Sequence, residues 1–119
     1  MKRILLIEPG FYQRVDLEDT LSPHSFQVTS VKDRFSALMK LKSQVFNMIM
    51  TSMREDIKEL MFLLKSLRDT GTTIPIVVLS TTPTAETVQR LSRFQPIEII
   101  VQPYSIKQLV QRLDQISGG

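Results

Sequence analysis

The feature that most constrains the fold of this chain is a pair of continuous apolar runs of strand length. Residues 3–8 contain the run Ile-Leu-Leu-Ile, and residues 74–80 contain the run Ile-Val-Val-Leu. A strand with one face in water alternates apolar and polar residues, and these two runs do not alternate. They are therefore predicted to be buried on both faces, as strands are in a parallel sheet covered by helices.

Three further segments complete a predicted sheet. Residues 46–51 and 97–102 are short, apolar and flanked by polar residues or proline. Residues 26–31 alternate between apolar and polar side chains, which predicts an edge strand.

Helical periodicity separates these strands. Two segments place apolar residues on one helical face, and their stripes are Ile57, Leu60, Met61, Leu64 and Leu67 in residues 57–68, and Ile106, Leu109, Val110, Leu113 and Ile116 in residues 106–116. Ser105 stands at the expected N-cap of the last helix, and Asp33 at that of an earlier one. The remaining predicted core positions are Leu17 and Leu21 in residues 12–21, Phe35, Leu38 and Leu41 after Asp33, and Ala85, Val88 and Leu91 in residues 84–93.

The resulting order is a strand followed by a helix, five times over, in 119 residues. This order predicts one α/β domain over residues 1–119, a doubly wound (βα)5 parallel sheet with helices on both faces. The Gly118–Gly119 ending leaves open that the domain is the N-terminal part of a longer protein. No apolar run is long enough for a membrane span or a signal peptide, so we expect a cytoplasmic location.

Composition excludes several kinds of chemistry. The chain has no cysteine and one histidine, His24, so disulfides, thiolate catalysis and Cys- or His-rich metal sites are excluded. The net charge of +3 is spread over both halves of the sequence. Nucleic-acid binders concentrate such charge on one surface. Direct nucleic-acid binding by this domain is therefore not expected.

The chain resembles the receiver domain of two-component response regulators, the CheY-like family. The resemblance covers nearly the whole length and lies in the segments KRILLIE, FNMIMTS, IPIVVLS and QPYSIKQL, together with Arg14, Leu17 and Leu21 in one helix and Asp33, Ala37 and Leu38 at another. It implies a flavodoxin-like sheet with strand order 2-1-3-4-5. It also implies a role in two-component signal transduction or a phosphorelay.

The resemblance further implies where a phosphorylation site would stand. Receivers use two acidic residues after the first strand, a nucleophilic aspartate after the third, a Ser or Thr after the fourth and a Lys after the fifth. The matching positions here hold Glu8, Pro9, Ser52, Ser80 and Gln102. Mg²⁺ requires hard oxygen ligands, and Pro9 and Ser52 supply no carboxylate. We therefore expect no catalytic residue, no enzymatic activity, no cofactor, and weak or absent Mg²⁺ binding.

The output side of the family pattern is altered as well. Receivers carry an aromatic switch residue three positions before the lysine, and that position is Ile99 here. The leading hypothesis is a pseudo-receiver that acts through phosphorylation-independent contact with a protein partner or as a homodimer. The resemblance places that contact on the face formed by the fourth helix, the fifth strand and the fifth helix. The candidate interface residues are Thr87, Arg90, Tyr104, Lys107 and Gln111, with the exposed aromatic Phe62 as an additional candidate.

Two alternatives remain open from the sequence. The first is a small-ligand or anion-sensing module in the vacated pocket, formed by Ser52, Ser80, Thr81 and Gln102. The second is the regulatory domain of a DNA-binding response regulator, with the DNA-binding part outside residues 1–119.

Two smaller expectations concern charged and nucleophilic groups. Glu8 is expected to be a solvated carboxylate with Arg54 as a candidate partner, rather than a residual metal ligand. The charged run at 54–59 is expected to be a solvated helix start, with a substitute acidic site or a docking surface as the alternatives. A serine hydrolase built on Ser52 or Ser80 with His24 is not expected. The turn that carries His24 should lie at the opposite end of the sheet, one strand length or ~17–20 Å away.

Overall fold

The computed structural model describes residues 1–53 and 57–118, in which five strands and five helices alternate along the chain. The strands are β1 (Lys2–Ile7), β2 (Phe26–Val31), β3 (Met48–Ser52), β4 (Ile76–Ser80) and β5 (Ile97–Val101). The helices are α1 (Phe11–Leu21), α2 (Arg34–Ser43), α3 (Ile57–Asp69), α4 (Ala85–Leu91) and α5 (Ile106–Ile116). Short 3-10 helices follow α1 and α4, namely η1 (Ser22–His24) and η2 (Ser92–Phe94).

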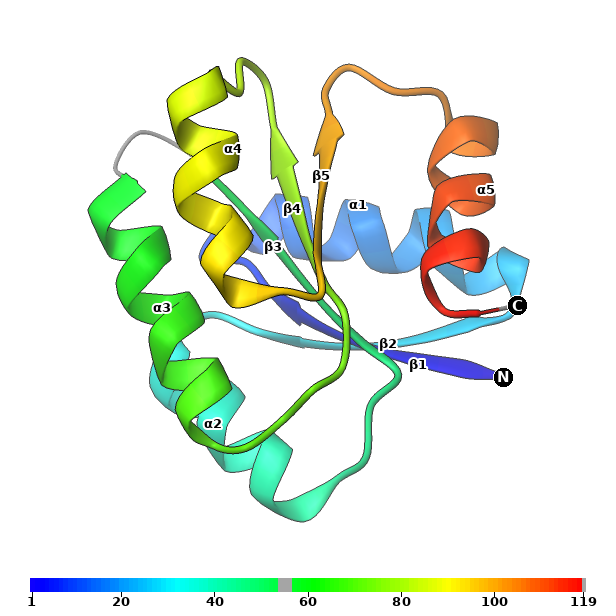
Figure 1. Cartoon of the computed structure of the whole chain (residues 1–119). Helices are drawn as coiled ribbons and strands as arrows, with labels where there is room; N and C mark the ends of the chain where they lie inside the picture. The colour runs from blue at the N-terminus through cyan, green and yellow to red at the C-terminus, as the bar shows by residue number, and fades with distance from the viewer. Residues whose placement is uncertain (54–56, 119) are drawn as a thin grey trace.

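All five strands are parallel and lie in the order β2-β1-β3-β4-β5. The predicted fold class, strand order and edge position of β2 are therefore confirmed. Helices α1 and α5 cover one face of the sheet, and α2, α3 and α4 cover the other (Figure 1). The chain changes direction across the sheet between β1 and β3, which is where ligands bind in open α/β sheets.

The apolar runs fill two cores, one on each side of the sheet. Leu5 and Ile7 face the α2, α3 and α4 side, whereas Ile4 and Leu6 face α1 and α5. These four side chains are between 0% and 4% exposed. A strand that buries both of its faces has no position for a polar residue, which explains the absence of alternation.

Side-chain caps start the helices where the sequence predicted them. The Asp33 carboxylate accepts a hydrogen bond of 2.8 Å from the backbone N–H of Ser36. Ser105 and Gln108 form a reciprocal capping box at the start of α5. Such caps satisfy backbone N–H groups that lack partners within a helix, and so fix where each helix begins.

Two helices present different faces from those predicted. In α2, Phe35 is 73% exposed, and Ala37 is the residue that is buried. In α4, Ala85 and Val88 are exposed, while Thr87 and Leu91 are buried. Both helices are short and contain few apolar residues, so a single apolar side chain on the exposed face is enough to make the predicted buried face wrong. No helix in the described part of the chain is long and apolar enough to cross a membrane.

Candidate functional site

The predicted site residues lie at the carboxyl ends of neighbouring parallel strands. Glu8 directly follows β1, and Ser52 and Ser80 are the last residues of β3 and β4. Gln102 follows β5, and its backbone N–H donates to the Ser80 carbonyl at 2.8 Å. The fold therefore brings these positions to the same edge of the sheet, as the resemblance implied.

Glu8 is a buried carboxylate rather than a solvated one, because only 2% of its surface is exposed. One carboxylate oxygen accepts from the backbone N–H of Gly10 at 2.7 Å, and the other accepts from the Ser52 hydroxyl at 3.3 Å. Burying a charge is costly unless hydrogen bonds compensate it, and these contacts supply part of that compensation. The expectation of a solvent-exposed Glu8 is wrong. Arg54, its suggested partner, lies outside the described residues.

Among the predicted site residues at this edge, Glu8 alone carries a carboxylate. Pro9 offers no side-chain oxygen, and the Ser52 hydroxyl already donates to Glu8. No group of three acidic, His or Cys side chains that could hold a metal occurs among residues 1–53 and 57–118. Mg²⁺ usually binds through one or two carboxylates together with waters and phosphate oxygens.

Ser80 is the least satisfied polar side chain of this edge. It is 1% exposed, and its hydroxyl has no hydrogen-bond partner within the described residues. A buried hydroxyl without a partner costs about 1–3 kcal/mol, so such groups are uncommon and often have a functional explanation.

Gln102 and Tyr104 form the other side of this edge. Burial raises the pKa of the Tyr104 hydroxyl above its ordinary value, a hydrogen bond with Gln102 opposes that rise, and the nearby charge of Asp16 adds to it. Tyr104 also packs against the core formed by α1 and α5. It is thus a half-buried anchor at the start of α5, with only part of its ring available to a partner.

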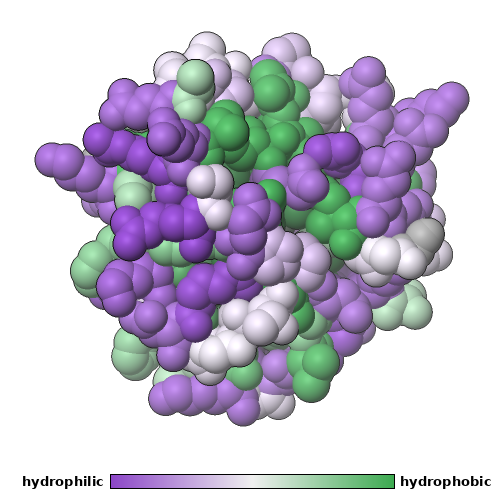
Figure 2. Space-filling model, viewed as in Figure 1, coloured by the Kyte–Doolittle hydropathy of each residue, from purple (hydrophilic) through white to green (hydrophobic). Residues whose placement is uncertain are grey.

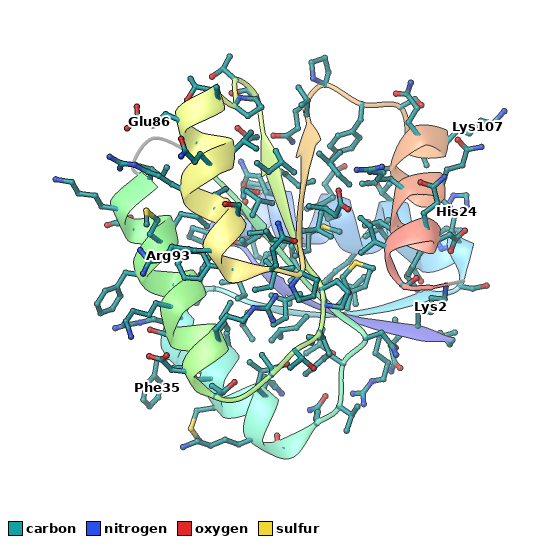
Figure 3. All side chains as sticks on the ribbon, in the orientation of Figure 1. Lys2, His24, Phe35, Glu86, Arg93 and Lys107 are labelled. Carbon is teal, nitrogen blue, oxygen red and sulfur yellow. The ribbon has the colours of Figure 1, made fainter. Side chains whose placement is uncertain are left out.

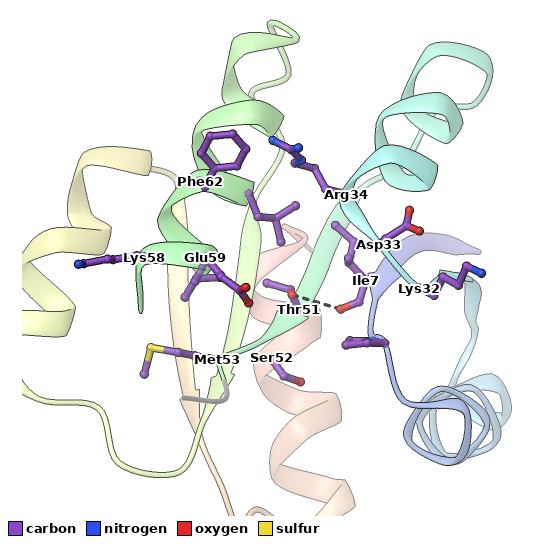
Figure 4. A pocket seen from close by; sticks show the side chains of 13 residues that line it. Ile7, Lys32, Asp33, Arg34, Thr51, Ser52, Met53, Lys58, Glu59 and Phe62 are labelled. Carbon is purple, nitrogen blue, oxygen red and sulfur yellow. Dashed lines mark hydrogen bonds between the residues drawn. The ribbon is translucent and has the colours of Figure 1, made fainter. Parts of the chain in front are cut away.

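A groove of about 970 Å³ opens beside the strand ends, between α2 and α3 (Figure 4). Its lining residues include Ile7, Pro9, Lys32, Asp33, Arg34, Thr51, Ser52, Met53, Lys58, Glu59, Leu60, Phe62 and Leu63. Of the residues predicted for a ligand pocket, Ser52 lines this groove, and Ser80, Thr81 and Gln102 do not.

Phe62 lies at the outer end of this groove. It is exposed, as predicted, but the Arg34 guanidinium lies 4.2 Å from the centre of its ring. Arg34 also donates to the Ser66 hydroxyl at 3.3 Å. Phe62 therefore takes part in a contact between α2 and α3, which gives it a structural role alongside its exposed surface.

The face formed by α4, β5 and α5 contains apolar surface that the sequence analysis missed. Val88, Val101 and Ile106 are each about half exposed, and Figure 2 shows hydrophobic side chains gathered over β5 between α4 and α5. The sequence analysis places Val88 and Ile106 in the core because they are apolar and fall on a helical stripe, and residue type alone does not reveal that they are exposed.

The candidate interface residues have different positions on this face. Arg90 pairs with Glu86 at 3.0 Å on the exposed side of α4, and Lys107 and Gln111 are exposed on α5 (Figure 3 labels Glu86 and Lys107). Thr87 is 9% exposed and its hydroxyl contacts that of Thr84, so it offers little surface to a partner.

The remaining sequence positions are also located. Ile99 is partly buried against the core below α2, α3 and α4. His24 is exposed in η1, just before β2 begins, whereas Ser52 and Ser80 end their strands. His24 therefore does not meet either serine. Of the charged run at 54–59, residues 54–56 lie outside the described residues.

The arrangement of the sheet, the helices and the polar strand ends is that of the CheY-like receiver fold, a flavodoxin-like fold. No protein-family model matches the sequence, and no curated protein matches it either.

Solved structures match the chain over nearly its full length. Similar structures include the Vibrio cholerae chemotaxis protein CheY4, with a TM-score of 0.87, 20% identity and 98% of each chain covered. The receiver domain of Francisella response regulator 1452 matches with a TM-score of 0.83 and 18% identity, over 99% of this chain and 98% of that one. The receiver domain of the Pseudomonas aeruginosa sensor histidine kinase PA1611 matches with a TM-score of 0.80 and 19% identity, over 99% and 98%. At these identities the likeness establishes the fold.

Proposed function

We propose that this chain is a pseudo-receiver, a receiver-fold module that signals through protein contact without forming an aspartyl phosphate. The single observation that carries the proposal is the residue at the carboxyl end of β3, where receivers have the nucleophilic aspartate. A serine stands there, and its hydroxyl donates to the buried Glu8 carboxylate. A serine side chain has no carboxylate, so no aspartyl phosphate can form at this position.

The neighbouring residues support the same proposal. The family pattern places an acidic residue where Pro9 stands and a lysine where Gln102 stands. Gln102 is neutral, so it supplies no positive charge to balance a phosphoryl group. Ile99 cannot reproduce the rotamer change of an aromatic switch residue. The proposed domain therefore binds neither phosphate nor magnesium as a receiver does, and it needs no cofactor.

The experiment is an amide NMR titration with Mg²⁺ followed by beryllofluoride, run beside a phosphorylatable receiver as the positive control. We expect no saturable shifts at Glu8, Ser52 or Ser80. We also expect no phosphoryl mass after incubation with acetyl phosphate and Mg²⁺. A phosphoryl group on Ser52 would overturn the proposal.

The contact surface we propose is the face of α4, β5 and α5. Support comes from the half-exposed Val88, Val101 and Ile106, with the charged Arg90 and Lys107 nearby. Apolar residues ringed by polar ones are typical of protein interfaces. A crosslinking experiment in cells should lose the contact when Val101→Glu and Ile106→Glu are combined, and should retain it in Lys65→Glu on α3.

Ser80 favours a second candidate, a ligand-sensing domain. Its buried hydroxyl has no partner in the described part of the chain, and a small polar ligand or anion would supply one. Inorganic phosphate is a suitable first probe, because a ligand that binds the folded state raises the melting temperature. A concentration-dependent rise that Ser80→Ala abolishes would favour this candidate over the pseudo-receiver.

A further inference from the structure

The positive charge of the molecule is concentrated on one segment. Residues 32–45 contain four basic side chains and one acidic one, a net charge of +3, which equals the net charge of the whole chain. The rest of the sequence is therefore balanced. The even distribution expected from the two halves of the sequence does not hold for individual helices.

The exposed side of α2 combines this charge with apolar surface. Phe35 is 73% and Met39 51% exposed, and Lys42 follows them on the same face of the helix. A shallow recess of about 420 Å³ runs along this face, lined by Phe35, Ser36, Met39, Lys40, Lys42 and Ser43. Figure 3 shows Phe35 pointing away from the body of the molecule. We call these six residues the α2 surface.

Helix α1 carries the opposite charge in the same arrangement. Tyr12 is 82% exposed, and Val15, Asp16 and Asp19 are exposed with it along one stripe. Residues 11–21 contain three acidic side chains and one basic one. We call Tyr12, Val15, Asp16 and Asp19 the α1 surface.

The two surfaces match in spacing as well as in charge. Asp19 follows the aromatic Tyr12 by seven residues, and Lys42 follows the aromatic Phe35 by seven, a rise of about 10 Å in each helix. Each surface begins with an apolar half and ends with a charged half. No ion pair within the described residues involves Lys40, Lys42, Asp16 or Asp19. Helices side by side and parallel would place aromatic against aromatic and acid against base.

We propose that the α1 surface of one molecule docks on the α2 surface of a second copy of this chain. The two helices cover opposite faces of the sheet, so a molecule cannot join its own surfaces (Figure 1). The contact uses different surfaces on the two molecules. It therefore produces head-to-tail chains or closed rings rather than a symmetric pair. It is also distinct from the α4, β5 and α5 face proposed above.

The observations favour a second copy over nucleic acid or an anionic membrane. A phosphate backbone is bound through positive charge, and it gives no reason for the exposed aromatic and acidic residues on α1. A membrane would use the basic helix but not the acidic one. A second copy uses both surfaces, and it explains why each carries an aromatic residue at the same distance from its charges.

The test is sedimentation of purified protein over a wide range of concentration, at low and at high salt. We expect wild-type protein to associate, and the association to weaken with added salt because exposed charges are screened. Lys40→Glu with Lys42→Glu, or Asp16→Lys with Asp19→Lys, should each weaken association at least about tenfold, since like charges then face each other. Lys65→Glu on α3 is the matched control and should associate as wild type does.

Mixing the two variants distinguishes a head-to-tail contact from any other. Alone, each variant presents like charges at the contact, but the altered α2 surface of the first is acidic and the altered α1 surface of the second is basic, so these two are opposite in charge. In a mixture, the intact α1 surface of one variant should bind the intact α2 surface of the other, and the two altered surfaces are again opposite in charge, so the association that each variant lacks alone should return. A monomeric wild type, association that survives both variants, loss in only one variant, or a mixture that stays monomeric would each overturn the proposal. Circular dichroism confirms that the variants are folded.

Discussion

The amino ends of β4 and β5 differ from the carboxyl ends of β1, β3 and β4 in how their polar groups are satisfied. At the amino ends of β4 and β5, the Arg68 guanidinium donates to the backbone carbonyls of Thr72, Ile74, Phe94 and Pro96, at distances from 2.7 to 3.2 Å. At the carboxyl ends, Glu8 accepts from Gly10 and Ser52, while the Ser80 hydroxyl has no partner in the described part of the chain.

This difference separates a structural region at the amino ends of β4 and β5 from a candidate functional edge at the carboxyl ends. One charged side chain at the amino ends joins the end of α3 to the segments that lead into β4 and β5. Carbonyls that leave water require such donors. The carboxyl ends retain the Ser80 hydroxyl, which is buried and has no partner among the described residues. Such groups destabilise a fold and persist where a site requires them.

The largest predicted effect is at Arg68. Replacing it with Leu leaves several carbonyls without a donor, and we expect a loss of about 3 kcal/mol in the free energy of unfolding. Burial lowers the pKa of Arg68, which remains charged at neutral pH. Urea denaturation measures the loss. Arg90→Leu is the control, because its exposed pair with Glu86 should contribute less than about 1 kcal/mol. Equal losses in the two variants would contradict the structural role of Arg68.

The second prediction tests whether the hydrogen bonds to the Glu8 carboxylate stabilise the fold. Glu8→Ala removes the acceptor for Gly10 and Ser52 and leaves a small cavity, so we expect a loss of about 2 kcal/mol. Glu8→Gln keeps the shape and one carbonyl acceptor, and should recover most of that loss. If Glu8→Ala unfolds no more easily than wild type, the carboxylate is not stabilised by these contacts.

The third effect has the opposite sign. Ser80→Ala removes a buried hydroxyl that has no partner among residues 1–53 and 57–118, so we expect the protein to become more stable by about 1 kcal/mol. Thr51→Val is the matched control at the same end, because the Thr51 hydroxyl donates to the Ile7 carbonyl at 3.1 Å and its loss should destabilise the fold. Thermal unfolding compares the two. A destabilised Ser80→Ala would mean that the hydroxyl has a partner and that the two ends are alike.

Sequence reasoning predicted the fold because the fold depends on local patterns of apolar residues and helix caps. Two unbroken apolar runs, the stripe of α5 and its Ser105 cap are local patterns, and each survives in the structure. The predicted buried face of α4 was wrong because a helix of seven residues with few apolar side chains does not define one face clearly.

The candidate site was predicted less completely, since contacts between distant residues leave no local pattern. The resemblance placed Glu8, Ser52 and Ser80 at one edge, but the burial of Glu8 depends on Gly10 and on a strand 44 residues away. Nothing in the sequence marks the four carbonyl contacts of Arg68, because all of them use backbone atoms outside α3 and two of them, Phe94 and Pro96, lie more than 20 residues away. The half-exposed Val88 and Ile106 were assigned to the core on residue type alone.

The smallest effect concerns Asp33, which caps α2 at the same end as Glu8 but in full contact with solvent. Hydrogen bonds from the Ser36 backbone and side chain lower its pKa below the ordinary value of 3.8. A lowered pKa in the folded state means that the cap contributes stability above that ordinary value and loses it as the pH falls through the lower, folded value. Asp33→Asn keeps a neutral cap. The stability difference between wild type and Asp33→Asn should therefore be constant from neutral pH to about pH 5 and shrink below pH 4. Denaturant unfolding at several pH values measures it. If the stability difference between wild type and Asp33→Asn persists at the lowest pH, the charge of Asp33 does not cause it. The exposed Asp33 would then not differ from the buried Glu8 in the way proposed here.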